Sequence, residues 1–367
     1  MPVSTDRQDR GLRHSAAARH TLSILTAFAL LMCCVIAADS SGVSPARAAD
    51  EGGVSAPVPD RAAHYSQHAN DVMEEADTYL RKGDCYHAEK IILDAEAGAS
   101  AEDQKAYDGR LAVIYSMWSF EMIRSGMIPD AITIGKQRLD LAIKMADTKT
   151  RCSTLIDLGM CYTSEAQYKE ATRCLKEALA LSRQLGSKAD EAAALSRLGN
   201  VYRDLGQYPE AISSYEKSLR LATEAGAKTE EEETLMFLSQ TCLSQDKPGD
   251  ALKYALDGLA KGKAIGEPQH IMEDLAQVGR AYYALRQYDK AADYYLRALK
   301  MADGTYQLAS RMDIRIDLGI VRDSQGRQDE ALKLCEEAMV FAKKIDDKDA
   351  QKIIQHNIDD INRRRRH

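Results

Sequence analysis

The stretch LSRLGNVYRDLGQYPEAISSYEKSLRLA, residues 195–222, decides the fold because its spacing recurs along the chain. In it Leu198-Gly199 is followed by Tyr202, and Tyr208 by Ala211. Leucine and tyrosine four residues apart lie on one face of a helix. Where two helices cross closely, only a residue about as small as glycine or alanine fits between them. The stretch therefore predicts two helices packed against each other.

This pattern returns every 40 residues. Small residues hold its crossing positions: Ala131, Ala171, Ala211, Ala251, Ala291 and Ala331 on one register, and Gly159, Gly199, Gly279 and Gly319 on another. A fixed period of this length is typical of a solenoid, in which each helix pair buries its apolar face against its neighbours.

These residues resemble the tetratricopeptide repeat pattern, L-G-x-x-Y, then Y-x-x-A, then a small residue and leucine at Ser218-Leu219. The usual unit has about 34 residues, so the sequence is similar to the longer variety of Pins/LGN-type scaffolds and bacterial sensor input regions. The resemblance implies an all-α fold, a right-handed superhelical solenoid of about seven helix pairs plus a C-terminal capping helix.

We place the repeats by the 40-residue register, with boundaries at 63–100, 110–148, 150–187, 189–227, 229–267, 269–305 and 309–346. Residues 347–367 predict the capping helix, with Ile353, Ile354, Ile358 and Ile361 on its apolar face, and a basic tail. We expect the tail, residues 363–366, to complement the negative end of the last helix dipole. A membrane or partner contact is the alternative.

The first 48 residues predict an export signal. An arginine-rich start precedes the apolar stretch 22–38, and Ala46-Arg47-Ala48 forms a small-x-small cleavage site. We expect cleavage after Ala48 and a periplasmic, cell-envelope or secreted product with a flexible leader at 49–62. Cleavage after Ala37 and lipidation at Cys33 are weaker alternatives. An uncleaved N-terminal anchor is another, because the apolar stretch is just about long enough to span a membrane.

Charge and cysteine content exclude several functions. A net charge of −7 and a pI near 5.7 give no basic face for nucleic acid. Beyond the signal, the cysteines show no C-x-x-C spacing, which argues against zinc and against a dense disulfide framework. We expect buried thiols, with disulfides as the alternative, at Cys85, Cys152, Cys161, Cys174, Cys242 and Cys335.

No combination of residues indicates catalysis, a cofactor or a metal. His64 and His68 are one helical turn apart, but we expect two solvated side chains there. The acidic run Glu230–Glu233 predicts a solvated helix start, where the carboxylates are stabilised by the positive end of the helix dipole. Gly258 and Gly262 predict close helix contacts. We therefore predict that the protein is not an enzyme and has no cofactor or metal.

The family resemblance implies that the first helices of successive repeats line a concave groove. Candidate groove residues are apolar in the early repeats and polar later: Phe120, Ile123, Met160, Asn200, Arg203, Gln240, Arg280 and Tyr283. Arg203 and Arg280 on one polar track favour an acidic or carboxylate-bearing peptide. The alternative is that the polar stripe is ordinary solvated surface and that residues 49–62 cover the apolar stripe.

The sequence therefore predicts a non-enzymatic, exported scaffold that binds a protein or peptide partner. The alternative function is a ligand-sensing input component that signals through a partner protein. We expect no nucleic-acid partner, and no membrane contact apart from the signal segment.

Overall fold

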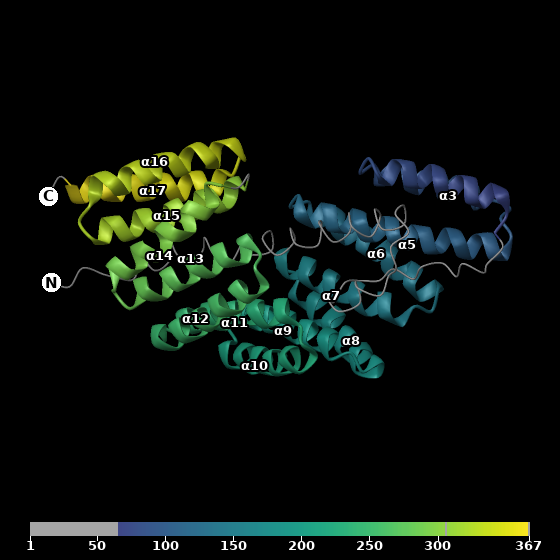
Figure 1. The fold of residues 1–367 in the computed structure, drawn as a ribbon, viewed down its shortest axis with the longest axis horizontal. Coiled ribbons are helices and arrows are strands. Elements are labelled where there is room, and N and C mark those ends of the chain that lie inside the picture. Colours follow the sequence, from purple (N-terminus) through teal and green to yellow (C-terminus); the bar gives the residue numbers. More distant parts are fainter. Residues whose placement is uncertain (1–64, 305–306, 366–367) are drawn as a thin grey trace. The chain divides into compact units, whose positions relative to one another are not determined.

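The computed structural model describes residues 65–304 and 307–365, which form helices joined by short turns (Figure 1). This part of the chain holds fifteen helices and no strand, so the predicted all-α class is confirmed. The predicted signal (1–48) and leader (49–62) lie outside the described residues. The helices are α3 (Gln67–Leu80), α4 (Cys85–Ala95), α5 (Ala101–Arg124), α6 (Ile128–Lys144), α7 (Thr148–Ser164), α8 (Tyr168–Leu185), α9 (Lys188–Asp204), α10 (Tyr208–Ala225), α11 (Lys228–Ser244), α12 (Pro248–Ile265), α13 (Pro268–Ala284), α14 (Tyr288–Ala302), α15 (Leu308–Ser324), α16 (Gln328–Lys344) and α17 (Lys348–Arg365).

Helix α3 and its successors form seven consecutive pairs, and α17 follows the last pair. Local chemistry sets many of their ends. The Ser100 hydroxyl accepts a hydrogen bond from the Asp103 amide at the start of α5. Gly186 ends α8 with φ of 67°, a left-handed conformation in which a side chain would be strained.

Helix α5 differs from the prediction. It begins at Ala101 and runs for 24 residues, whereas we predicted the second repeat to start at residue 110. The early start is supported by the Ser100 cap and by Asp103, whose Oδ1 accepts a hydrogen bond from the Ser66 amide at 2.9 Å. The carboxylate thus ties the beginning of α3 to the beginning of α5.

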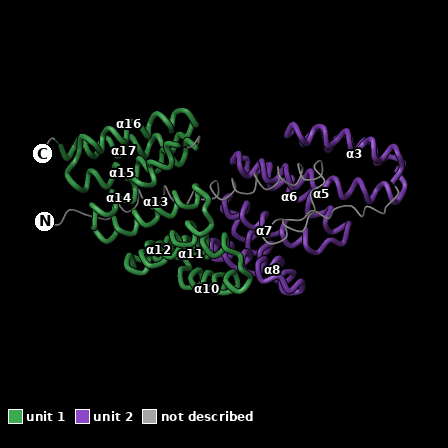
Figure 2. The backbone as a smooth tube through the Cα atoms, viewed as in Figure 1, with its two compact units in different colours: residues 1–20, 202–367 green, residues 21–201 purple. Residues whose placement is uncertain are grey.

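The chain divides into two compact units, and the boundary lies within α9 (Figure 2). Unit 2 ends at Val201, and the helices of unit 1 begin at Tyr202. In unit 1 each helix from α10 to α17 packs on the next. The first helices α11, α13 and α15 also contact one another in sequence. In unit 2 the helices from α3 to α8 pack in the same consecutive way, and α3 also contacts α5. This order of contacts is that of a helical solenoid.

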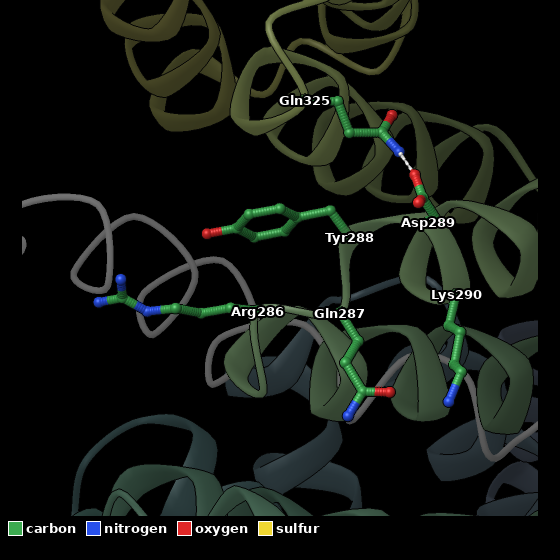
Figure 3. Close-up of a pocket in the computed structure, with 6 residues that line it drawn as sticks. All are labelled: Arg286, Gln287, Tyr288, Asp289, Lys290 and Gln325. Carbon is green, nitrogen blue, oxygen red and sulfur yellow. Dashed lines mark hydrogen bonds between the residues drawn. The ribbon is translucent and has the colours of Figure 1, made fainter.

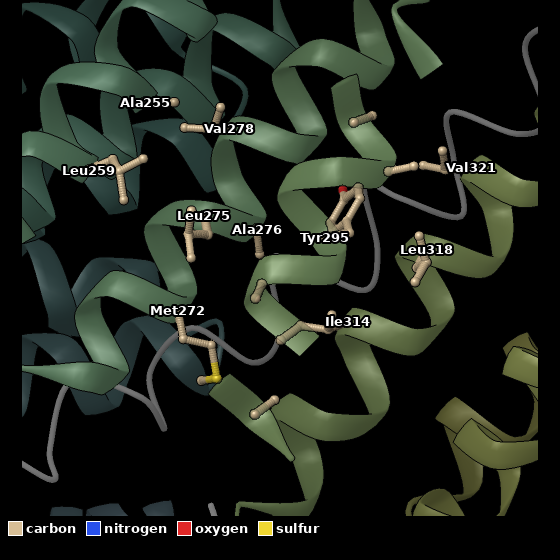
Figure 4. Packing of buried hydrophobic residues seen from close by; sticks show 14 residues of the cluster. Ala255, Leu259, Met272, Leu275, Ala276, Val278, Tyr295, Ile314, Leu318 and Val321 are labelled. Carbon is tan, nitrogen blue, oxygen red and sulfur yellow. The ribbon is translucent and has the colours of Figure 1, made fainter. Parts of the chain in front are cut away.

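Small residues stand where the helices cross, as predicted. A Cβ atom added at Gly159 would lie 2.4 Å from Leu175 Cγ, and one added at Gly279 would lie 3.0 Å from the Tyr295 ring. Ala291, on the alanine register, is fully buried. Its neighbours in the core of unit 1 include Tyr295 and Leu318, which fill the space beside the crossing (Figure 4).

Helix α17 covers the last repeat, as the predicted cap does. Ile354 and Ile361 are buried against residues of α15 and α16. The basic tail does more than complement a dipole: Arg364 pairs with Asp323 of α15, and Arg365 pairs with Asp329 of α16. These ion pairs attach the end of the cap to the repeat beneath it.

All six cysteines of the described residues are buried free thiols, which was the favoured alternative. Burial raises the pKa of Cys85 to about 11 and that of Cys161 to about 12, so these thiols stay protonated and poorly reactive. They serve as small apolar side chains of the core.

Among the helices of residues 65–365 that the structure describes, none combines the length and the hydropathy that a membrane crossing requires.

Candidate functional site

The eight predicted groove residues fall in both units, so each half is described within its own unit. Phe120 and Ile123 on α5, Met160 on α7 and Asn200 on α9 belong to unit 2, and Arg203 on α9, Gln240 on α11, and Arg280 and Tyr283 on α13 belong to unit 1.

In unit 2 the apolar candidates are not equivalent. Phe120 and Met160 are partly exposed, whereas Ile123 is only 4% exposed and packs in the interior. Ile123 is therefore removed from the candidate set, because a residue already covered by its own chain offers no surface to a peptide.

In unit 1 the polar candidates lie on neighbouring first helices. We call the partly exposed surface formed by Gln240, Arg280 and Tyr283, on α11 and α13, the first-helix face. The buried side chains of Gln277 on α13 and Asp317 on α15 contact it through Arg280. These side chains bridge one repeat to the next. Gln277 Nε2 donates to Ser239 Oγ at 2.9 Å, and Ser239 Oγ in turn donates to the Ala251 carbonyl.

Arg280 forms the strongest of these bridges. Its Nε donates to Asp317 Oδ2 at 3.0 Å, and its Nη1 donates to Gln277 Oε1 at 3.3 Å. Arg280 is 14% exposed and Asp317 only 2%. Burial raises the pKa of Asp317, and the Arg280 guanidinium opposes that rise. Because the guanidinium keeps its charge at any ordinary pH, the two side chains form a buried ion pair.

Arg203 is held just as closely. Its Nε and Nη2 donate to Asp204 Oδ1, its Nη1 donates to Gln240 Oε1 at 3.1 Å, and its guanidinium lies over the Phe237 ring. We predicted that Arg203 and Arg280 would bind an acidic peptide, and this prediction is therefore revised. Both guanidinium groups already bind acceptors of the chain itself, so their charge is largely used within the fold.

Gln240 is the candidate with bonding capacity left. Its Oε1 accepts from Arg203, but its Nε2 is buried and has no hydrogen-bond partner among the described residues. A buried amide N–H without an acceptor costs about 1–3 kcal/mol, so such groups are normally satisfied by water or a ligand. Gln240 as a whole is partly exposed, so a rotation of its side chain would bring the amide to a peptide carbonyl.

A second cluster of polar side chains lies at the acidic run, and the prediction that this run is solvated was wrong. Glu231, Glu232 and Glu233 are buried rather than solvated. Helices α12 and α13 pack over them: Lys261 of α12 binds Glu231, and His270 Nδ1 of α13 lies 2.6 Å from Glu232 Oε2. The run sits in the interior of unit 1 and not at an open helix start.

The 40-residue register holds a signal that could have revealed this cluster. Position 232 aligns with four fully buried or nearly fully buried residues of other repeats, namely Cys152, Ala192, Met272 and Met312. A glutamate in that column is a charged residue at a core position. Asp274 is the same kind of exception, because it aligns with Thr154, Ala194, Thr234 and Ile314.

One further hollow, of about 460 Å³, lies at the turn between α13 and α14. It is lined by Arg286, Gln287, Tyr288, Asp289, Lys290 and Gln325 (Figure 3). Gln325 Nε2 donates to Asp289 Oδ1 at 2.7 Å, and the Arg286 and Tyr288 side chains point away from that pair. The hollow brings together no nucleophile, base and oxyanion donor of the kind that catalysis needs.

The described residues contain no group of three or more His, Cys, Asp or Glu side chains placed to hold a metal ion. Of the predicted histidine pair, His68 is exposed on α3, and His64 lies outside the described residues.

Solved structures with a similar fold share little sequence with this chain. BtubC from P. vanneervenii is 18% identical, with a TM-score of 0.53 over 60% of this chain and 92% of that one. A Rap protein in complex with competence and sporulation factor is 13% identical, with a TM-score of 0.57 over 79% of this chain and 80% of that one. A signal transduction ATPase with a tetratricopeptide repeat sensor, from Pyrococcus horikoshii, is 18% identical, with a TM-score of 0.58 over 78% of this chain and 44% of that one.

No curated protein matches the sequence. The sequence does match tetratricopeptide repeat families, at residues 150–224 and 190–264 for one and 278–347 for another, which together make up half of the chain. With the consecutive helix pairs and the small residues at their crossings, these matches show that the chain belongs to the tetratricopeptide repeat family.

Proposed function

We propose that this protein is a non-enzymatic, exported scaffold that binds a protein or peptide segment on the first-helix face of unit 1. The observation that carries the proposal is the Gln240 amide, whose Nε2 lacks an acceptor among the described residues. A peptide backbone supplies a carbonyl oxygen at every residue, so an extended segment laid along this face would satisfy the amide. The similar Rap structure contains a bound factor, which supports a binding role for this fold.

Exchanging Gln240 for glutamate tests the role of its amide. Gln240→Glu keeps an oxygen for Arg203 but replaces the N–H donor with an acceptor, which repels a peptide carbonyl. We expect binding to weaken about tenfold or more, since an unmade hydrogen bond to a buried group costs about 1–3 kcal/mol. Residues 49–367 are immobilised, partners are captured from the native cell envelope, and the dissociation constant of the retained partner is measured for parent and variant.

The matched control is Gln184→Glu, the same chemical change on the exposed surface of α8. The control should retain the partner with parental affinity and should keep the helical content of the parent. Equal affinity of the Gln240→Glu variant and the parent would remove the first-helix face of unit 1 as the binding site.

Export is proposed from the order of charged, apolar and small residues in the first 48 positions. We expect natively produced protein outside the cytoplasm to begin at or near Ala49, as determined by N-terminal sequencing. Protein that is exported yet keeps residues 1–48 in the membrane fraction would indicate the uncleaved anchor. Full-length protein recovered from the cytoplasm alone would contradict export.

The ligand-sensing alternative is supported by the similarity to the tetratricopeptide repeat sensor of the Pyrococcus horikoshii ATPase. A sensor changes its affinity for a second protein when its ligand binds. Capture of the partner is therefore measured with and without a ligand bound to the first-helix face. The ligand should change partner binding if the protein is a sensor and leave it unchanged if the protein is a scaffold.

A further inference from the structure

Three buried side chains join α11 to α13 in unit 1. Glu232 of α11 is 2% exposed and Asp274 of α13 is 1% exposed, and His270 of α13 is buried beside them. His270 Nδ1 lies 2.6 Å from Glu232 Oε2, and the carboxyl groups of Glu232 and Asp274 lie within hydrogen-bonding reach of each other. A hydrogen bond between two carboxyl groups requires that one of them carries a proton.

The Asp274 carboxyl occupies a niche made by two glycines of α12. A Cβ atom at Gly262 would lie 2.1 Å from Asp274 Oδ2, and one at Gly258 would lie 3.3 Å from Oδ1. The repeats at 150–187, 189–227, 269–305 and 309–346 carry alanine or serine at these two positions, with Ala298 and Ala302 as the next pair along the chain. The two glycines therefore provide the space that the carboxyl group needs, and α12 closes over it.

The surroundings favour a neutral Asp274. Its Oδ2 has no hydrogen-bond partner among the described residues, and a buried carboxylate oxygen without a donor is costly. Lys261 of α12 forms an ion pair with Glu231 and not with Asp274. With the proton on Asp274, its O–H donates to Glu232, which also accepts from His270.

The charged groups that face the cluster are mostly acidic. They come from each of the three helices packed around it: Glu230, Glu231 and Glu233 from α11, Lys261 from α12, and His270 and Glu273 from α13. Polar contacts with the adjoining helices α10 and α15 include Ser218 with Thr234 and Gln307 with Gln269. Burial, followed by the neighbouring carboxylates, raises the pKa of Glu232 and of Asp274 to about 9.

We propose that the Glu232–Asp274–His270 cluster is a proton-dependent latch that holds the fifth and sixth repeats together and releases them when its shared proton is lost. Loss of the proton places two buried carboxylates in contact inside the α11–α12–α13 packing, where they repel each other. The same two first helices carry Gln240 and Arg280, so opening of the latch changes the first-helix face. The latch itself does not depend on the proposed binding role.

The expected pH dependence follows from the direction of the pKa shift. In the unfolded chain an aspartic acid loses its proton near pH 4, whereas in the folded protein the cluster keeps it up to about pH 9. Between these values the folded state binds one proton more than the unfolded state. The contribution of the cluster to stability is therefore greatest at low pH and falls as pH rises through this window, with a tenfold increase in the opening equilibrium constant for each pH unit.

Asp274→Asn tests the latch, since asparagine is neutral at every pH and its N–H₂ can donate to Glu232. Because repeat arrays open in parts, we measure amide hydrogen exchange on the full chain, corrected for the intrinsic effect of pH, from pH 6 to 9. In the parent, the protection of α11–α13 should fall about a hundredfold from pH 6 to pH 8 relative to α15–α17. In the variant the fall should shrink to the part that Glu273 contributes, because burial raises the pKa of Glu273 to about 7.

Two further variants complete the test. Asp257→Asn makes the same change on the exposed surface of α12 and should keep the parental pH dependence. Glu232→Gln places an N–H₂ donor beside Asp274 and should also flatten the profile, which covers the case in which Asp274→Asn does not fold. Parental pH dependence in both cluster variants, or constant protection of α11–α13 in the parent, would overturn the proposal.

Discussion

Replacing Arg280 by alanine is expected to lower the free energy of unfolding by about 3–5 kcal/mol. The substitution leaves the Asp317 carboxylate, 2% exposed, without the guanidinium that binds it at 3.0 Å. A buried charge that loses its partner keeps its full desolvation cost and recovers none of it from the ion pair. Urea unfolding followed by circular dichroism measures the change.

Arg297→Ala is the matched control, because Arg297 on helix α14 is half-exposed, pairs with the exposed Asp293 and lies over the Tyr294 ring. Exposed pairs contribute about 0–1 kcal/mol, so this variant should stay close to the parent. Adding Asp317→Asn to Arg280→Ala should restore part of the lost stability, since the stranded charge is then removed. The ion-pair account fails if Arg280→Ala is no more destabilising than Arg297→Ala.

Gly159→Ala is expected to destabilise the chain by about 1–3 kcal/mol, although alanine is normally the better helix residue. The added methyl group would lie 2.4 Å from Leu175 Cγ, and Leu175 is fully buried. The helices α7 and α8 must separate or Leu175 must leave its rotamer. Thermal unfolding of the two proteins gives the difference.

Gly109→Ala makes the same substitution in α5, at a site where an added Cβ meets no atom within 4 Å. It should leave stability unchanged or raise it by up to about 1 kcal/mol. Combining Gly159→Ala with Leu175→Ala removes the clash, so the two changes together should cost less than their sum. Equal effects of Gly159→Ala and Gly109→Ala would show that the crossing is not tightly packed.

The fold was predictable from the sequence because its determinants are local and repeated. Helix pairs follow from the spacing of leucine, tyrosine and small residues, and each repeat restates the same pattern, as Gly159 and Gly279 show at their crossings. Gly186 ends α8 in the left-handed conformation that its sequence position favours, whereas the start of α5 at the Ser100 cap was missed. Even Ile354 and Ile361 of the cap could be placed, since they follow the helical period.

The candidate site was less predictable, because contacts between repeats decide what each polar side chain does. Arg280 and Asp317 are 37 residues apart, and Glu232 and His270 are 38 apart, so no local pattern pairs them. Only the tertiary structure shows that Arg280 is bound within the fold and that Gln240 retains a donor.

The acidic run Glu230–Glu233 also shows which features the sequence predicts and which depend on contacts between repeats. Its position at a helix start was correct, but local composition says nothing of the helices that pack over it. The sequence by itself determined the helix pairs, their register and the small crossing residues, because these depend on periods of a few residues along one chain segment. The tertiary structure alone decided which charges are buried and paired, because burial and partners depend on side chains brought together from neighbouring repeats.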